Sequence, residues 1–243
     1  MSDDVCALVG AVGGAGTTRL ALEFGATLAG DGRSVVVVDA AYATQGLVTT
    51  FTDPVDPDVT RAVTDDRPLA TATYDLDVPT GRLALAPARA PFERLSRAKT
   101  SECARRLAGR IGEAAHEYDH VLVDVPPVAT NQAVAAVTAA DRVGLVVPDT
   151  QRGADALPRT LDRLADVDAR VDTIVANRAN GAPEVGDADA AVPESETTAL
   201  SSAPVCPGDG EFEAAVAAAV ATTVGADVEP ERQESSLTDY LPG

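Results

Sequence analysis

Lysine is nearly absent from this sequence, and tryptophan is absent altogether. Lys99 is the single lysine among 19 basic residues, which face 38 acidic ones and leave a formal net charge of −19. With no basic stretch to neutralise backbone phosphates, we expect no direct contact with nucleic acid. Such an acidic, lysine-poor composition suits a salt-loaded cytoplasm, where 1 M salt screens charges beyond about 3 Å, and it predicts a halophilic source. An acidic surface that receives a basic partner is the alternative.

Long apolar runs and paired cysteines are missing too. No stretch approaches the roughly 20 apolar residues that span a bilayer, and the first residues show no signal segment. The three cysteines, Cys6, Cys103 and Cys206, are scattered and odd in number, as is typical of small buried side chains in a reducing compartment. We therefore expect a cytoplasmic protein without a membrane helix.

Continuous apolar segments alternate with segments of helical periodicity along most of the chain. Strands are expected at residues 5–9, 34–39, 82–87, 121–124, 143–147 and 171–177. Helices are expected at residues 20–29, 59–64, 100–116, 131–139, 154–165 and 211–224, with Ser101 as an N-cap. Buried strands separated by helices predict a doubly wound α/β fold, with a mostly parallel sheet and helices on both faces.

The remaining segments have weaker patterns. Residues 179–198 are expected to form a surface loop, and residues 204–207 a short strand and turn. We expect one domain over residues 1–224 and an acidic, flexible tail over residues 225–243. The apolar residues near the end of this tail predict either a docking peptide or an unattached chain end; they are Leu237, Tyr240 and Leu241.

A glycine-rich turn joins the first expected strand to the first expected helix. Its sequence is Val12-Gly13-Gly14-Ala15-Gly16-Thr17-Thr18. A turn of this kind directs backbone N–H groups and a helix N-terminus at one point, which suits a phosphate group.

This turn resembles the deviant phosphate loop of the ParA/MinD family of P-loop ATPases, which reads K-G-G-x-G-K-T-T. Its three glycines and Thr18 match that pattern, whereas Val12 and Thr17 stand where the family has its two lysines. At about 1.5–3 kcal/mol for each charged hydrogen bond, the two losses would weaken nucleotide binding by roughly two to four decades. Arg19 is the nearest replacement cation, and bound K⁺ is another.

Two acidic positions extend the resemblance. Asp39 ends the second strand, where the family has D-x-D, and Ala41 replaces the second acid. Asp124 resembles the first residue of the family motif D-x-P-P-G, in which Val128 replaces the glycine. The resemblance implies that Asp39 and Asp124 hold Mg²⁺ together with Thr18, and that Asp39 is the one candidate for a catalytic role.

Two further segments resemble the part of the family site that binds adenine. Asn177-Arg178 follows a strand as the family's N-R pair does, and Pro207-Gly208-Asp209 resembles the loop that lines the base. The nucleotide-binding residues that the resemblance implies are Gly13, Gly14, Ala15, Gly16, Thr17, Thr18, Arg19, Asn177, Arg178, Pro207 and Asp209.

Three functions are consistent with these residues. The resemblance implies a degenerate, haloarchaeal-type member that binds ATP or ADP with Mg²⁺ as a switch with little or no hydrolysis, in cell division, partitioning or the placement of surface machinery. One alternative is a pseudo-ATPase scaffold that binds a protein partner without nucleotide. The other is an active ATPase in which Arg19 or K⁺ replaces the lysines. Protein partners are expected, and a homodimer and a heterodimer with a homologue are both open.

Overall fold

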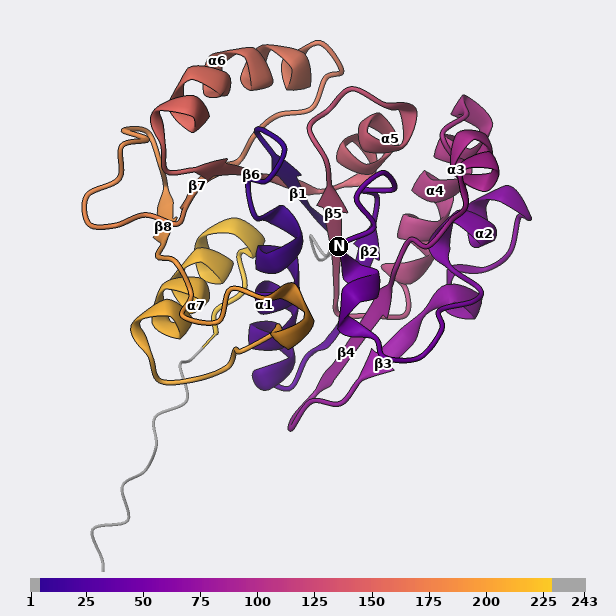
Figure 1. The fold of residues 1–243 in the computed structure, drawn as a ribbon, viewed down its shortest axis with the longest axis horizontal. Helices are drawn as coiled ribbons and strands as arrows, with labels where there is room; N and C mark the ends of the chain where they lie inside the picture. The colour runs from indigo at the N-terminus through magenta and orange to yellow at the C-terminus, as the bar shows by residue number, and fades with distance from the viewer. Residues whose placement is uncertain (1–4, 229–243) are drawn as a thin grey trace, which may run out of the picture.

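An eight-stranded sheet runs through residues 5–228, the part of the chain that the computed structural model describes (Figure 1). Its strand order is β3-β4-β2-β5-β1-β6-β7-β8, and all neighbouring pairs are parallel except β3 with β4. The strands are β1 (Val5–Gly10), β2 (Ser34–Asp39), β3 (Tyr74–Leu76), β4 (Arg82–Ala86), β5 (His120–Val125), β6 (Arg142–Pro148), β7 (Thr173–Asn177) and β8 (Ala190–Val192).

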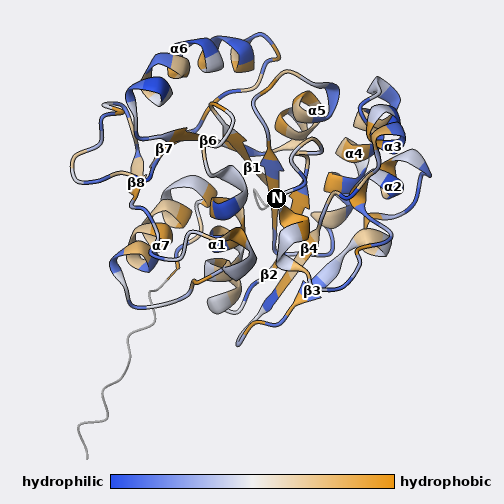
Figure 2. Ribbon diagram, viewed as in Figure 1, coloured by the Kyte–Doolittle hydropathy of each residue, from blue (hydrophilic) through white to orange (hydrophobic). Residues whose placement is uncertain are grey.

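Helices cover both faces of this sheet, which confirms the predicted doubly wound fold. They are α1 (Thr17–Gly30), α2 (Val59–Thr64), α3 (Phe92–Ala98), α4 (Ser101–Ala114), α5 (Asn131–Ala139), α6 (Gln151–Ala165) and α7 (Glu211–Val224), with short 3₁₀ turns at Leu47–Thr50, Leu69–Ala72 and Leu200–Ser202. Helices α1 and α7 share one apolar core with one face of the strands, and α2 to α6 lie over the other face. The strands are mostly apolar, whereas the outer face of α6 is hydrophilic (Figure 2).

Three local predictions are wrong. Residues 179–198, expected to form a surface loop, contain β8, which pairs in parallel with β7 and buries Val192. Thr100, not Ser101, caps α4, because its hydroxyl accepts the Cys103 N–H at 3.4 Å. Residues 204–207 form no strand: two of the four are prolines, which cannot donate to a ladder. The N–H groups of Val205 and Cys206 instead donate to the buried carboxylate of Glu23, at 2.9 Å each.

Two further predictions concern the C-terminal tail and membrane helices. Helix α7 ends at Val224, and Gly225 follows in the left-handed conformation at φ 77°. Residues 229–243, which make up most of the predicted tail and include its apolar end, lie outside the described residues. Within residues 5–228, no helix has both the length and the hydropathy that a membrane crossing requires.

Helix α1 carries the glycine-rich turn at its start, so its position on the sheet places that turn. A Cβ atom on Gly25 would lie 2.8 Å from Leu83 Cδ1 and 3.1 Å from Val37 Cγ2, both in the fully buried core. Only glycine therefore lets α1 approach β2 and β4 this closely.

Two helical glycines provide a matched pair for testing this packing. Gly25→Ala should destabilise the protein by about 1–2 kcal/mol, since the overlap with the core exceeds the gain in helix propensity. Gly109→Ala should stabilise it by about 0.5–1 kcal/mol, because a Cβ atom there meets nothing within 4 Å. Urea unfolding measures both changes, and a stabilising Gly25→Ala would contradict the close approach of α1.

Candidate functional site

The glycine-rich turn keeps a backbone shape that requires glycine. Gly14 and Gly16 have φ values of 81° and 90°, and Gly16 begins α1 with no side chain capping the helix. Cβ atoms on Gly13 and Gly14 would meet nothing within 4 Å, so this half of the turn borders open space. An uncapped helix N-terminus beside open space is a suitable site for an anion.

Two buried carboxylates lie next to this turn. Asp39 and Asp124 are register partners on β2 and β5, and their exposed fractions are 0% and 1%. The Thr18 hydroxyl donates to Asp124 Oδ2 at 2.6 Å, which joins the start of α1 to the end of β5. Asp39 accepts the N–H groups of Ala41 at 2.8 Å and Ala88 at 3.2 Å. The structure thus brings Thr18, Asp39 and Asp124 together at the carboxyl ends of the strands.

The electrostatics of this pair favour a bound cation. Burial raises the pKa of Asp39 well above its usual range, and the charge of Asp124 raises it further. Burial also raises the pKa of Asp124, against the lowering effect of the Thr18 hydrogen bond. Among the described residues, no basic side chain forms an ion pair with either acid. A hydroxyl and two carboxylates with no basic partner are the oxygen ligands that suit the Mg²⁺ ion implied by the fold family.

Asn177, at the end of β7, and Arg178 contact the glycine-rich turn. Asn177 Nδ2 donates to the Ala15 carbonyl at 2.8 Å, and its Oδ1 accepts the Arg178 N–H at 3.0 Å. Arg178 has a φ of 61°, and its guanidinium donates to the Gly14 carbonyl at 3.2 Å. The nitrogen and the oxygen of the Asn177 side-chain amide thus both have partners in the protein. The exposed Arg178 supplies a cation at the turn.

Arg19 is bound in a different direction. Its guanidinium contacts Glu23, the Thr197 carbonyl and, at 3.0 Å, Ser195 Oγ. It also lies over the Phe212 ring, 5.6 Å from the ring centre. The N–H groups of the Arg19 guanidinium, which a phosphate would need as donors, are therefore bonded to Glu23 and to the segment 193–198 that follows β8.

The space beside Gly16 is small. A cavity of about 90 Å³ is lined by Gly16, Arg19, Asn177 and Phe212 among others, with the segment 193–198 along one side. Pockets that hold cofactors and drug-sized ligands measure about 300–1,000 Å³. A nucleoside would fit on this side only after the segment moves.

The two residues predicted to line the base, Pro207 and Asp209, lie in different places. Asp209 lines a different cavity, of about 400 Å³, which the segment 193–198 also borders. Pro207 packs against Gly30, at the opposite end of α1 and about 20 Å along the helix from Gly16. The structure therefore does not bring Pro207 to the glycine-rich turn.

Three of the four positions that depart from the family pattern are buried, and the fourth, Val12, is half-buried. Thr17 is 8% exposed, with its hydroxyl close to Gly10 beneath the turn. Ala41 and Val128 are buried, and Val128 packs in the apolar core on the face covered by α2 to α6. Where the family pattern has a lysine, an acid and a glycine, this chain thus has buried, uncharged side chains.

Comparison with known families agrees with this geometry. The family model described as AAA domain matches residues 4–175, which contain the glycine-rich turn and both buried acids. The chain belongs to this AAA domain family. No curated protein sequence matches it.

Solved structures share the fold of this AAA domain protein at low sequence identity. MinD from Pyrococcus horikoshii OT3, complexed with Mg-ADP, has a TM-score of 0.67 and 21% identity over 80% of this chain and 82% of that one. A ParA family ATPase from Chlorobium tepidum TLS has a TM-score of 0.69 and 19% identity over 96% and 95%. A Cyanothece McdA complex with ATP has a TM-score of 0.62 and 21% identity over 77% and 76%. These likenesses confirm the ParA/MinD-like fold.

Sequence reasoning missed what surrounds the turn. It did not place the Arg178 guanidinium on the Gly14 carbonyl or the segment 193–198 against Arg19. One signal was available, because Arg19 and Glu23 are four residues apart on a predicted helix and so lie on the same side.

Replacing Asp124 by asparagine tests the cost of the buried acids. Burial raises the pKa of this carboxyl in the folded state above its unfolded value, so stability falls as pH rises from about 4 towards 7. Asp124→Asn removes that loss. Without magnesium, we expect the variant to be about 2–3 kcal/mol more stable than the parent at pH 7, and equally stable near pH 4.

Urea unfolding at both pH values measures the difference. The exposed Asp187→Asn is the control, and should leave the stability of the parent unchanged at either pH. Added Mg²⁺ should stabilise the parent more than Asp124→Asn. Equal stability of the parent and Asp124→Asn at pH 7 would show that the buried charge has no cost.

Proposed function

We propose that this AAA domain protein is a nucleotide-binding switch that takes ATP or ADP with Mg²⁺ and hydrolyses it little or not at all. One observation carries the proposal: an open glycine-rich turn at a helix N-terminus lies beside two buried carboxylates that have no ion-pair partner within residues 5–228. The turn would receive phosphates through its backbone N–H groups. Thr18, Asp39 and Asp124 would hold the metal ion, which when bound neutralises phosphate charge.

The uncharged side chains at the family's catalytic positions support the proposed lack of fast hydrolysis. Phosphoryl transfer depends on cations that stabilise the spreading negative charge and on a group that orients the attacking water. Val12 and Thr17 carry no charge, and Ala41 offers no acid. The residues that remain can hold a phosphate chain and a metal ion, but they lack these catalytic groups.

Arg178 is the side chain that we assign to phosphate binding. It is exposed and its guanidinium already lies at Gly14, so a small rotation would bring it to an anion in the turn. Arg19 remains the prediction from sequence, although its donors are held by Glu23 and the segment 193–198.

The cellular role is proposed by analogy. Two of the similar structures are described as a septum site-determining protein and a cell division ATPase. We extend that kind of role, intracellular positioning in division, partitioning or surface machinery, to this chain. A protein partner, a dimer with itself or a homologue, and a cytoplasmic location in a halophile belong to the same proposal.

A nucleotide-free scaffold is the second candidate, and a specific observation favours it. The cavity beside Gly16 measures only about 90 Å³, and the Asn177 amide that would recognise adenine is bonded to the turn itself. In this case the turn is a remnant and the protein acts by binding a partner.

Thermal unfolding with Mg·ATP separates the two candidates. Ligand at a hundredfold over its dissociation constant stabilises the folded state by about 2.7 kcal/mol. For a chain of this length the melting temperature should rise by about 5–10 °C. A phosphate-release assay should show turnover no faster than the same buffer without protein. An unchanged melting temperature at saturating Mg·ATP favours the scaffold, and rapid magnesium-dependent release would overturn the silent switch.

Paired arginine variants identify the phosphate cation. Arg178→Gln should weaken ATP binding by about 10–100-fold, the loss of one charge-assisted hydrogen bond. Arg19→Gln should change the affinity less than about threefold, because its guanidinium bonds elsewhere. Isothermal titration calorimetry measures both. The reverse order would assign the phosphate contact to Arg19.

A further inference from the structure

A second polar pocket lies at the same edge of the sheet, outside the candidate nucleotide site. It measures about 450 Å³ and is lined chiefly by residues of the loops after β2 and β4 and of α2 and α3. The polar and charged side chains of its lining are Gln45, Asp56, Arg61, Arg89 and Arg94. Because β5 and β2 separate β4 from β1, this pocket is roughly 10 Å or more from the glycine-rich turn.

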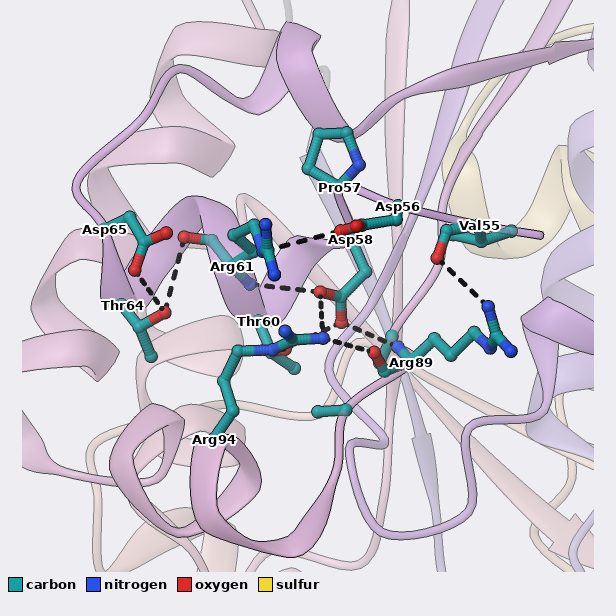
Figure 3. A network of polar contacts seen from close by, with 12 residues as sticks. Val55, Asp56, Pro57, Asp58, Thr60, Arg61, Thr64, Asp65, Arg89 and Arg94 are labelled. Carbon is teal, nitrogen blue, oxygen red and sulfur yellow. Dashed lines mark hydrogen bonds and ion pairs between the residues drawn. The ribbon is translucent and has the colours of Figure 1, made fainter.

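One buried carboxylate organises the pocket. Asp58 is fully buried, and Figure 3 shows it at the centre of the polar contacts. It accepts the backbone N–H of Arg89 at 2.7 Å and that of Arg61 at 3.2 Å. Arg94 forms an ion pair with it at 3.0 Å, and the Thr60 hydroxyl donates at 2.7 Å. All three arginines are thus fixed to the same carboxylate, two through the main chain and one through the side chain.

The positive charge of the pocket is only partly compensated. Asp58 neutralises Arg94, whereas Arg61 faces Asp56 at 3.4 Å across a contact in which Asp56 is 59% exposed. Such exposed pairs contribute little. Within residues 5–228, Arg89 forms no ion pair, and its guanidinium reaches only the Val55 carbonyl, at 3.5 Å. Two guanidinium groups therefore remain available in a chain whose net charge is −19.

Gln45 makes the wall between the two loops rigid. Its side-chain amide exchanges hydrogen bonds with the backbone of Ala90, donating at 3.2 Å and accepting at 3.3 Å. The pocket is therefore bounded by bonded segments on the β2 side and on the β4 side. Its volume lies within the range of about 300–1,000 Å³ that small-molecule sites occupy.

We propose that this pocket binds a small molecule that carries a phosphate group. The planar guanidinium of arginine matches phosphate oxygens with two parallel hydrogen bonds. Arg89 and Arg61 can each bind a different pair of oxygens on one dianionic phosphate, whereas a single carboxylate has oxygens for only one such fork. Arg94, held by Asp58, keeps the third side of the pocket in place. Binding in this pocket does not require a nucleotide at the glycine-rich turn.

Binding of inorganic pyrophosphate tests the proposal. Isothermal titration calorimetry is run at the lowest salt concentration at which the protein stays folded, since salt screens these contacts. Arg89→Gln is the main variant, because the backbone bond from residue 89 to Asp58 does not depend on its side chain. We expect it to weaken pyrophosphate binding at least about tenfold, the loss of one charge-assisted contact. Arg97→Gln, an exposed α3 arginine outside the pocket lining, is the matched control and should change the affinity less than about twofold.

Two further comparisons show where pyrophosphate binds and whether the pocket selects phosphate. Loss of pyrophosphate binding in Arg178→Gln but not in Arg89→Gln would place the anion at the glycine-rich turn and overturn the pocket. Citrate binding as tight as that of pyrophosphate would overturn the assignment to phosphate. So would no binding of pyrophosphate by the parent at about 10 mM. A melting temperature within about 2 °C of the parent confirms that Arg89→Gln is folded.

Discussion

Two carboxyl groups held side by side in the interior constrain this edge of the sheet. Asp39 and Asp124 end neighbouring strands, and neither has an ion-pair partner in the part of the chain that the structure describes. Buried carboxylates cost free energy unless they receive hydrogen bonds or a cation. Here the hydrogen bonds come from Thr18 at the start of α1, from Ala41 and from Ala88. The loops around the site are therefore positioned by the acids.

The shape of the glycine-rich turn and the chemistry of its relatives are separable. The shape depends on Gly14 and Gly16, whose φ values L-residues rarely adopt. The chemistry of the family, as the resemblance implies it, depends on side chains at positions that Val12 and Thr17 occupy here. A chain without the lysines can still form the turn, because the glycines set its backbone conformation. Backbone conformation serves phosphate binding, whereas side-chain charge serves catalysis. Backbone amides bind a phosphate, whereas cations lower the barrier to breaking it.

Much of the fold and part of the site follow from the sequence, for reasons that particular segments make clear. The fully apolar residues 34–39 and the helices at residues 59–64, 131–139 and 211–224 have clear patterns, and the structure gives them the same bounds. Asp39 and Asp124 could be placed together through the family resemblance, and parallel strands do end at one edge of the sheet. Strands β3 and β8 have three residues each, too few to show a period.

Contacts between distant irregular segments could not be predicted. Arg19 meets Ser195 and Thr197 across more than 170 residues, and no local pattern encodes where that segment lies. Pro207 carried a family motif, yet its position follows from the N–H groups before it, which bind Glu23. The arginines of the second pocket are spread over α2, a loop and α3, and they meet only because Asp58 binds all three.

The loop after β4 connects the two proposed sites. Ala88 donates its N–H to Asp39, and Arg89 donates its N–H to Asp58. Consecutive peptide groups are thus hydrogen-bonded to two different buried carboxylates. A ligand that shifts one of these peptides strains the hydrogen bond of the other. Thermodynamic linkage makes any such effect mutual: if an anion beside Arg89 alters the affinity for a cation beside Asp39 by some factor, the cation alters the affinity for the anion by the same factor.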